Sequence, residues 1–152
     1  MTTIAWDGKT LAADSMGDQN CLRMKVVKVH RGVLADGKAF IFGGAGRTSD
    51  CIQLYEWIKT LDSKTLTREL YPHQSDANDP ACLLAVKRDG VFHKTGPLLV
   101  PVYEDFYAVG SGRDFAISAM HFGKTAAEAV KHAIQFDLYS GGAVRTMTLE
   151  KL

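Results

Sequence analysis

The sequence has little that marks a specialised class of protein. No apolar run reaches the roughly 18 residues that span a bilayer, so we expect no membrane segment. Lys and Arg number 18 against 17 Asp and Glu, which leaves a net charge of +1. This balance argues against a nucleic-acid partner, because nucleic-acid binders carry a strongly basic surface. The N-terminal segment has neither the basic nor the apolar part of a secretory signal, so we expect a cytoplasmic protein.

Cysteine is scarce, with three in 152 residues. Cys21, Cys51 and Cys82 lie far apart and form no Cys-x-x-Cys, which predicts reduced thiols rather than disulfides. Cys51 falls in a helical pattern and Cys82 in an apolar strand, where we expect buried, inert thiols. The five histidines are scattered, so the sequence predicts no metal site.

Nucleotide-binding motifs are also missing. The segment Gly43-Gly44-Ala45-Gly46-Arg47-Thr48 is rich in glycine and precedes a predicted helix. It lacks the Gly-Lys-Ser/Thr of a phosphate-binding loop and the third glycine of the dinucleotide fingerprint. Gly110-Ser111-Gly112 is not the Gly-x-Ser-x-Gly of a nucleophile elbow. We therefore expect no cofactor.

What is present is ordinary globular composition, with 46% hydrophobic and 23% charged residues. This length predicts one domain over residues 1–152. Asp-Gly pairs at residues 7–8, 36–37 and 89–90 separate β-prone runs, and each is a hairpin signal. The strands expected around them are Thr2–Trp6 with Thr10–Asp14, Leu22–His30 with Ala39–Phe42, and Cys82–Arg88 with Val91–Lys94. Further extended segments are expected over Leu98–Tyr103, Phe106–Val109 and Ala143–Leu149.

Helices are predicted over Thr48–Leu61, where apolar residues recur at helical spacing, and over Arg113–Phe122 before Gly123. A third helix begins at Thr125, because Thr125-Ala126-Ala127-Glu128 is a capping box. Residues Ser63–Pro80 are polar and predict a long connection. Hairpins with grouped helices favour an α+β fold, in which antiparallel sheets are covered by helices.

One position is chemically unusual. Thr2 follows Met1, and its small side chain is of the kind that initiator-methionine removal tolerates. Removal would leave a hydroxyl and a free α-amine on one residue, which is a nucleophile together with its own base. An α-amine has a pKa near 7.7–8.0 and accepts a proton at neutral pH. Many ordinary first strands also begin Met-Thr, so this signal alone is weak.

Short blocks of sequence along the chain strengthen the signal at Thr2. They are Thr2-Thr3-Ile4-Ala5, Leu11-Ala12-Ala13-Asp14-Ser15, Lys25-Val26-Val27-Lys28-Val29, Gly44-Ala45-Gly46-Arg47-Thr48-Ser49-Asp50, Val109-Gly110-Ser111-Gly112 and Asp137-Leu138-Tyr139-Ser140-Gly141-Gly142-Ala143-Val144. In these blocks the chain resembles the proteasome β-subunits and their bacterial relative HslV, which are N-terminal-nucleophile (Ntn) hydrolases, and the blocks keep the family's order.

The resemblance implies a four-layer αββα sandwich and a catalytic set. Thr2 would be the nucleophile, and its amine would carry the proton to the leaving group. A lysine beside it would lower the pKa of that amine. We choose Lys25 because the apolar residues at +1 and +4 fit the family spacing, with Lys28 as the alternative. The remaining implied catalytic residues are Asp14, Gly46, Ser111, Asp137 and Ser140.

Asp14, Gly46 and Asp137 each have a plainer interpretation as a turn residue. Asp14 would pair with the lysine, and the Gly46 N–H would stabilise the oxyanion. Asp137 follows a predicted helix, where the dipole disfavours a carboxylate, so we expect a compensating local partner. Gly44 and Thr48 fall where the family lines its substrate pocket, and a glycine at position 44 suggests a roomy pocket.

The function that the resemblance implies is a threonine peptidase acting on unfolded protein or peptides once Met1 is removed. It also implies a homo-oligomeric ring and a possible AAA+ unfoldase partner. Two alternatives stay open at this stage. One is a non-catalytic proteasome-like structural subunit, and the other is an Ntn amidohydrolase that acts on a small molecule.

Overall fold

A computed structural model of the chain describes residues 2–73, 81–94 and 96–148. Within these residues, no helix is long and apolar enough to cross a membrane. The elements in chain order are β1 (Thr3–Trp6), β2 (Thr10–Ala13), β3 (Met16–Gln19), β4 (Leu22–Lys25), β5 (Val29–Val33), β6 (Ala39–Ala45), α1 (Thr48–Lys59), β7 (Cys82–Lys87), β8 (Gly90–Lys94), β9 (Leu99–Val102), β10 (Tyr107–Gly110), α2 (Arg113–His121), α3 (Ala126–Ile134) and β11 (Arg145–Thr148).

The strands form two main antiparallel sheets. One has the order β10-β1-β2-β11 and the other the order β5-β6-β7-β8-β9. The hairpins predicted at the three Asp-Gly pairs are confirmed, since β1 pairs with β2, β5 with β6 and β7 with β8. Gly8 at the first turn has φ +94°, whereas Asp7 does not enter the left-handed region. That turn is therefore not a type I′ turn, in which both central residues have positive φ.

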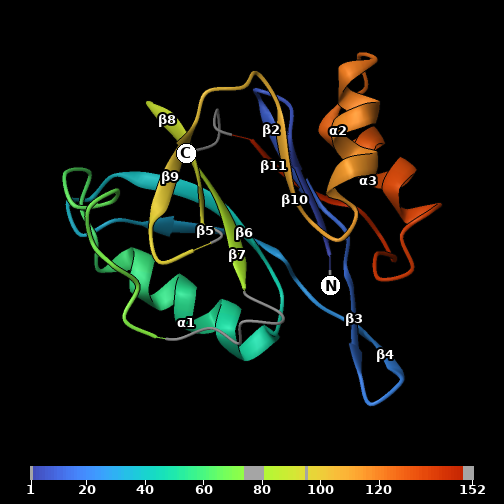
Figure 1. Ribbon diagram of the computed structural model, residues 1–152, viewed down its shortest axis with the longest axis horizontal. Coiled ribbons are helices and arrows are strands. Elements are labelled where there is room, and N and C mark those ends of the chain that lie inside the picture. The colour runs from blue at the N-terminus through green and yellow to red at the C-terminus, as the bar shows by residue number, and fades with distance from the viewer. Residues whose placement is uncertain (1, 74–80, 95, 149–152) are drawn as a thin grey trace.

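The predicted helices are confirmed. Helix α1 carries Leu54 and Ile58 on its buried face. The capping box at the start of α3 forms as expected, with Thr125 Oγ1 accepting from the Glu128 N–H and the Glu128 carboxylate accepting from the Thr125 N–H. Figure 1 shows α2 and α3 beside the sheet that contains β1, and α1 beside the sheet that contains β6.

Three apolar clusters hold these elements together. Phe42 of β6 packs with Leu54 and Ile58 of α1. A second cluster lies between the two sheets, where Ile4 of β1 meets Ile41 of β6. The third cluster joins the β1 sheet to α2 and α3 and consists mostly of alanine. Its alanines are Ala5, Ala12, Ala108, Ala116, Ala119, Ala126, Ala129 and Ala133.

The run Leu22–His30, predicted as one strand, is divided in the structure. Its first part is β4, which pairs with β3 in a hairpin that extends from the body of the molecule (Figure 1). Its last part belongs to β5. The turn between β3 and β4 places Asn20 and Cys21 at φ 51° and 65°. In the predicted connection Ser63–Pro80, residues 63–73 form turns and bends, and residues 74–80 lie outside the described residues.

Candidate active site

Thr2 lies directly before β1 and is 3% exposed. Its nitrogen donates to Ser111 Oγ at 3.1 Å, and its carbonyl accepts from the Gly112 N–H at 3.4 Å. Gly110 has φ +98°, and a Cβ there would lie 2.0 Å from the Thr2 carbonyl oxygen. Only glycine allows this approach. The turn after β10 therefore holds the start of β1 in place.

A buried ion pair lies next to this strand. Asp14, which is 0% exposed, follows β2, and Lys28 Nζ lies 3.0 Å from each of its carboxylate oxygens. Three backbone N–H groups also donate to this carboxylate. They belong to Thr3 at 3.0 Å, Met16 at 3.3 Å and Gly141 at 2.9 Å. Burial lowers the pKa of Lys28, and the adjacent Asp14 carboxylate opposes that shift.

The choice of Lys25 as the partner of Asp14 is wrong. Lys25 lies on β4, all four residues of which are exposed. The chain changes direction after β4, where the Val26 N–H donates to the Ser15 carbonyl at 2.9 Å. Lys28 then enters the buried space, whereas Val27 beside it is 50% exposed. Lys28, the alternative to Lys25, is the lysine that pairs with Asp14.

A second polar cluster forms around Asp137, three residues past the end of α3. Ser111 Oγ donates to Asp137 Oδ2 at 2.7 Å, and Ser140 Oγ donates to the same oxygen. The Tyr139 N–H donates to Asp137 Oδ1 at 3.2 Å. These donors are the local compensation that we expected for a carboxylate after a helix C-terminus.

The two clusters meet at the first residues of β1. Ser111 connects Asp137 to the Thr2 nitrogen, and the Thr3 N–H contacts Asp14. The loop after α3 touches both clusters, because it contains Ser140 and also Gly141, whose N–H donates to Asp14. Of the predicted catalytic residues, Thr2, Ser111, Asp137 and Ser140 are joined by direct hydrogen bonds. Asp14 is linked to them through Thr3, whose N–H donates to Asp14 and whose hydroxyl contacts Ser140.

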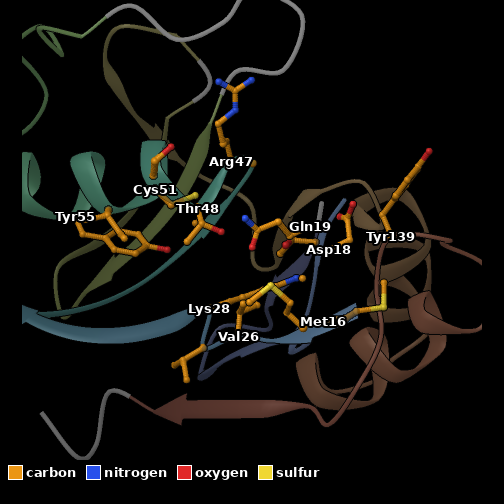
Figure 2. Close-up of a pocket in the computed structure, with 18 of the residues that line it drawn as sticks. Met16, Asp18, Gln19, Val26, Lys28, Arg47, Thr48, Cys51, Tyr55 and Tyr139 are labelled. Carbon is orange, nitrogen blue, oxygen red and sulfur yellow. The ribbon is translucent and has the colours of Figure 1, made fainter. Parts of the chain in front are cut away.

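Thr2 and Lys28 also line a cavity of about 780 Å³. Its apolar wall comes from the β3–β4 hairpin, the chain that follows it and α1, through Met16, Met24, Val26, Val27, Ile52 and Tyr55. Figure 2 shows Tyr55 and Cys51 on the α1 side of this cavity and Tyr139 on the opposite side. The predicted residues Gly44, Gly46 and Thr48 line it as well.

The two glycines differ in what they accommodate. Gly46 has φ +119°, and a Cβ there would lie 2.9 Å from Ala81 Cα. A Cβ on Gly44 would lie 2.6 Å from the Tyr55 hydroxyl. The space beside Gly44 is therefore filled by the Tyr55 ring and not left open, which corrects the expectation of a roomy pocket at that point.

Two other groups at this wall are held neutral by their surroundings. Burial raises the pKa of the Cys51 thiol to about 12, which agrees with the expected inert cysteine. Burial also lowers the pKa of His30, whose ring lies against Phe42 and Tyr55 with centroids 5.4 and 4.8 Å apart. Sequence reasoning missed Tyr55 and His30 as cavity residues, because each reads as ordinary core. No group of three potential metal ligands occurs among the described residues.

No protein-family model matches the chain, and no curated protein matches it. Several solved structures match the chain. BPH from Thiobacillus denitrificans, in complex with epoxomicin, is 20% identical with a TM-score of 0.68, covering 97% of this chain and 98% of its own. HslV from Trypanosoma brucei is 18% identical with a TM-score of 0.62, covering 96% and 97%. Anbu, an ancestral β-subunit from Yersinia bercovieri, is 10% identical with a TM-score of 0.64, covering 97% and 80%.

These likenesses extend over nearly the whole chain and define its fold. The structural neighbours of the chain are HslV and the Anbu β-subunit, and the chain has the proteasome-like fold that they share. The resemblance read from the sequence is confirmed at this level.

Proposed function

We propose that this chain is an N-terminal threonine peptidase, active once Met1 has been removed. The observation that carries the proposal is the convergence of two polar clusters, one buried and one half-buried, on the first residues of β1. Asp14 and Lys28 form one cluster, and Ser111, Asp137 and Ser140 form the other. Burying the charges of Asp14 and Lys28 costs free energy unless both are hydrogen-bonded, and a purely structural strand end does not need them.

In the proposed reaction the Thr2 hydroxyl attacks the substrate carbonyl, and its proton passes to the Thr2 α-amine. The resulting oxyanion is stabilised by the Gly46 N–H. Collapse of this intermediate breaks the C–N bond, and the ammonium returns the proton to the leaving amine. Water then hydrolyses the threonine ester with the same amine as its base, which regenerates Thr2.

The two clusters have different tasks in this reaction. The Lys28 ammonium lowers the pKa of the α-amine and favours negative charge at the attacking oxygen. The Asp14 carboxylate favours the charged form of Lys28 and so opposes the effect of burial on the pKa of this lysine. Ser111 and Asp137 orient the amine through the hydrogen bond at 3.1 Å. Gly44 and Thr48 line the site where the substrate side chain enters.

We also propose the finer features of the family for this chain. The three apolar clusters correspond to a four-layer αββα sandwich that forms a single domain. The functional form is a homo-oligomeric ring whose sites face an inner chamber, with unfolded protein or peptide as substrate and an AAA+ unfoldase as a candidate partner. The epoxomicin complex of the Thiobacillus denitrificans BPH supports a covalent peptide-like probe as the first test.

The test is the intact mass of the purified protein before and after treatment with a peptide epoxyketone. This reagent forms a stable ring only with a hydroxyl and a free amine on one terminal residue. We expect loss of Met1 and one adduct on the native protein, and no adduct on Thr2→Ala. A retained Met1, or loss of Met1 without an adduct, contradicts the proposal.

A further inference from the structure

We propose that Thr3 is a positioning residue that aligns the Thr2 amine by linking the two polar clusters, an inference that rests on the proposed function. Its backbone N–H donates to Asp14 Oδ1 at 3.0 Å. Its hydroxyl lies 2.7 Å from Ser140 Oγ. No other described residue between the clusters bonds Asp14 through its backbone and Ser140 through its side chain.

The direction of the hydroxyl bonds follows from the donors available. A carboxylate only accepts, so the single Ser140 hydroxyl hydrogen is committed to Asp137. Ser140 Oγ must therefore accept from Thr3 Oγ1. The chain of donation runs from Thr3 to Ser140 to Asp137, and Asp137 also accepts from Ser111, which contacts the Thr2 nitrogen.

The Thr3 side chain is enclosed by its surroundings. The residue is 0% exposed. A Cβ on Gly112 would lie 1.9 Å from Thr3 Oγ1 and 3.1 Å from Thr3 Cβ. The glycine at the start of α2 is therefore the residue that makes room for the Thr3 side chain. Its N–H also donates to the Thr2 carbonyl, so the same turn holds two consecutive residues of the N-terminal strand.

Loss of the hydroxyl has a chemical consequence beyond lost packing. Without Thr3 as a donor, Ser140 is a less polarised donor to Asp137, and more of the carboxylate charge acts on Ser111 and the amine. Added negative charge favours the ammonium form and raises the pKa of the α-amine. The acid side of the pH profile should then move to higher pH, because less free base is present at any given pH.

The experiment measures the rate of peptide epoxyketone adduct formation by intact mass from about pH 5 to pH 9. Thr3→Val removes the hydroxyl and keeps the β-branched shape, whereas Thr3→Ser keeps the hydroxyl. We expect Thr3→Val to react about tenfold more slowly at neutral pH, with its acid limb displaced upward, in keeping with one lost hydrogen bond at a buried site. Thr3→Ser should restore the wild-type profile to within about threefold. Thr146→Val, at an exposed position of β11, is the matched control and should react like wild type.

The outcomes separate this inference from the function on which it rests. No adduct on the wild-type protein overturns the proposed function and this inference with it. An adduct on wild type with an unchanged rate and pH profile in Thr3→Val overturns only the role of Thr3. If Thr3→Val does not fold, Thr3→Ala is compared with Thr3→Ser. These two differ only by the hydroxyl, and equal rates overturn the role.

Discussion

Replacing Asp14 by asparagine tests the account of the buried ion pair most directly. The substitution keeps the shape of the side chain and converts one acceptor oxygen into a donor. If the amide nitrogen took the place of Oδ2, the N–H groups of Met16 and Gly141 would both lose their acceptor. In the opposite orientation only the Thr3 N–H loses its acceptor, so we expect that orientation.

The free energies can be estimated from these contacts. One buried N–H without an acceptor costs about 1–3 kcal/mol. Breaking a buried ion pair by removing one partner costs about 3–5 kcal/mol in total, and that range includes the stranded donor. A domain of this size has a free energy of unfolding of about 5–15 kcal/mol. We therefore expect Asp14→Asn to fold with about half of its stability.

The loss of stability in Asp14→Asn should depend on pH, because Lys28 remains in the buried site without its partner. Burial already lowers the pKa of Lys28, and Asp14 is the largest opposing cause. Without Asp14 this pKa falls further, while the unfolded lysine keeps a pKa near 10.4. Above the folded pKa the unfolded state binds more protons, so the free energy of unfolding rises with pH by up to about 1.4 kcal/mol per unit. The deficit of the variant should shrink between its own folded Lys28 pKa and that of wild type.

The assay is urea unfolding followed by tryptophan fluorescence, to which the buried Trp6 contributes, at one protein concentration and at about pH 7 and pH 9.5. The double variant Asp14→Asn/Lys28→Met removes both charges and should be more stable than Asp14→Asn at the lower pH. Lys25→Met, on exposed β4, should change stability by less than about 0.5 kcal/mol. The reasoning would be refuted if the stability losses of Asp14→Asn and Lys28→Met simply added up in the double variant. It would also be refuted if Asp14→Asn were less stable than wild type by the same amount at both pH values.

Three further predictions concern the cavity and the thiols. Lys28→Met should slow epoxyketone adduct formation about a hundredfold, while Lys25→Met reacts within about threefold of wild type by intact mass. Gly44→Ala places a Cβ 2.6 Å from the Tyr55 hydroxyl. It should displace that ring and change the ratio of kcat/KM between peptides with small and large apolar side chains, and an unchanged ratio would show that the ring is not part of the pocket. Iodoacetamide on the native protein should add one adduct, at exposed Cys21, because burial raises the pKa of the other two thiols. A second adduct would contradict the raised pKa values of buried Cys51 and half-buried Cys82.

Much of the fold was predictable because its signals are local. The hairpins at the Asp-Gly pairs and the capping box at Thr125 depend on residues within four positions of each other, and both form. The sequence also indicated Thr2 and Asp14 as candidate catalytic residues. Both lie in short blocks that match the family in order, and such a match can be recognised without knowing how the chain packs. These features require no distant contact to be recognised.

The predictions failed where the structure depends on contacts between residues far apart in the sequence, or on an unusual backbone conformation. Lys25 and Lys28 have similar apolar neighbours, and only the bend after β4 determines which one reaches Asp14. The glycine at position 44 leaves room for something, but the sequence does not say that Tyr55 of α1 fills it. The hairpin β3–β4 was missed because its turn places Cys21 at positive φ, which this residue type rarely adopts.

The alanine layer between the β1 sheet and helices α2 and α3 sets how far apart the two halves of the site stand. Ser111 precedes α2 and Asp137 follows α3, while Thr2 and Asp14 adjoin strands of the sheet. The thickness of this layer therefore sets the distance between the Ser111–Asp137 side of the site and the Thr2–Asp14 side. A larger residue inserted there would separate donor from acceptor by a fraction of an ångström while costing only about 1–3 kcal/mol of stability. A saturation scan scored for turnover as well as folding should thus find its least tolerant positions in small residues that never touch the substrate.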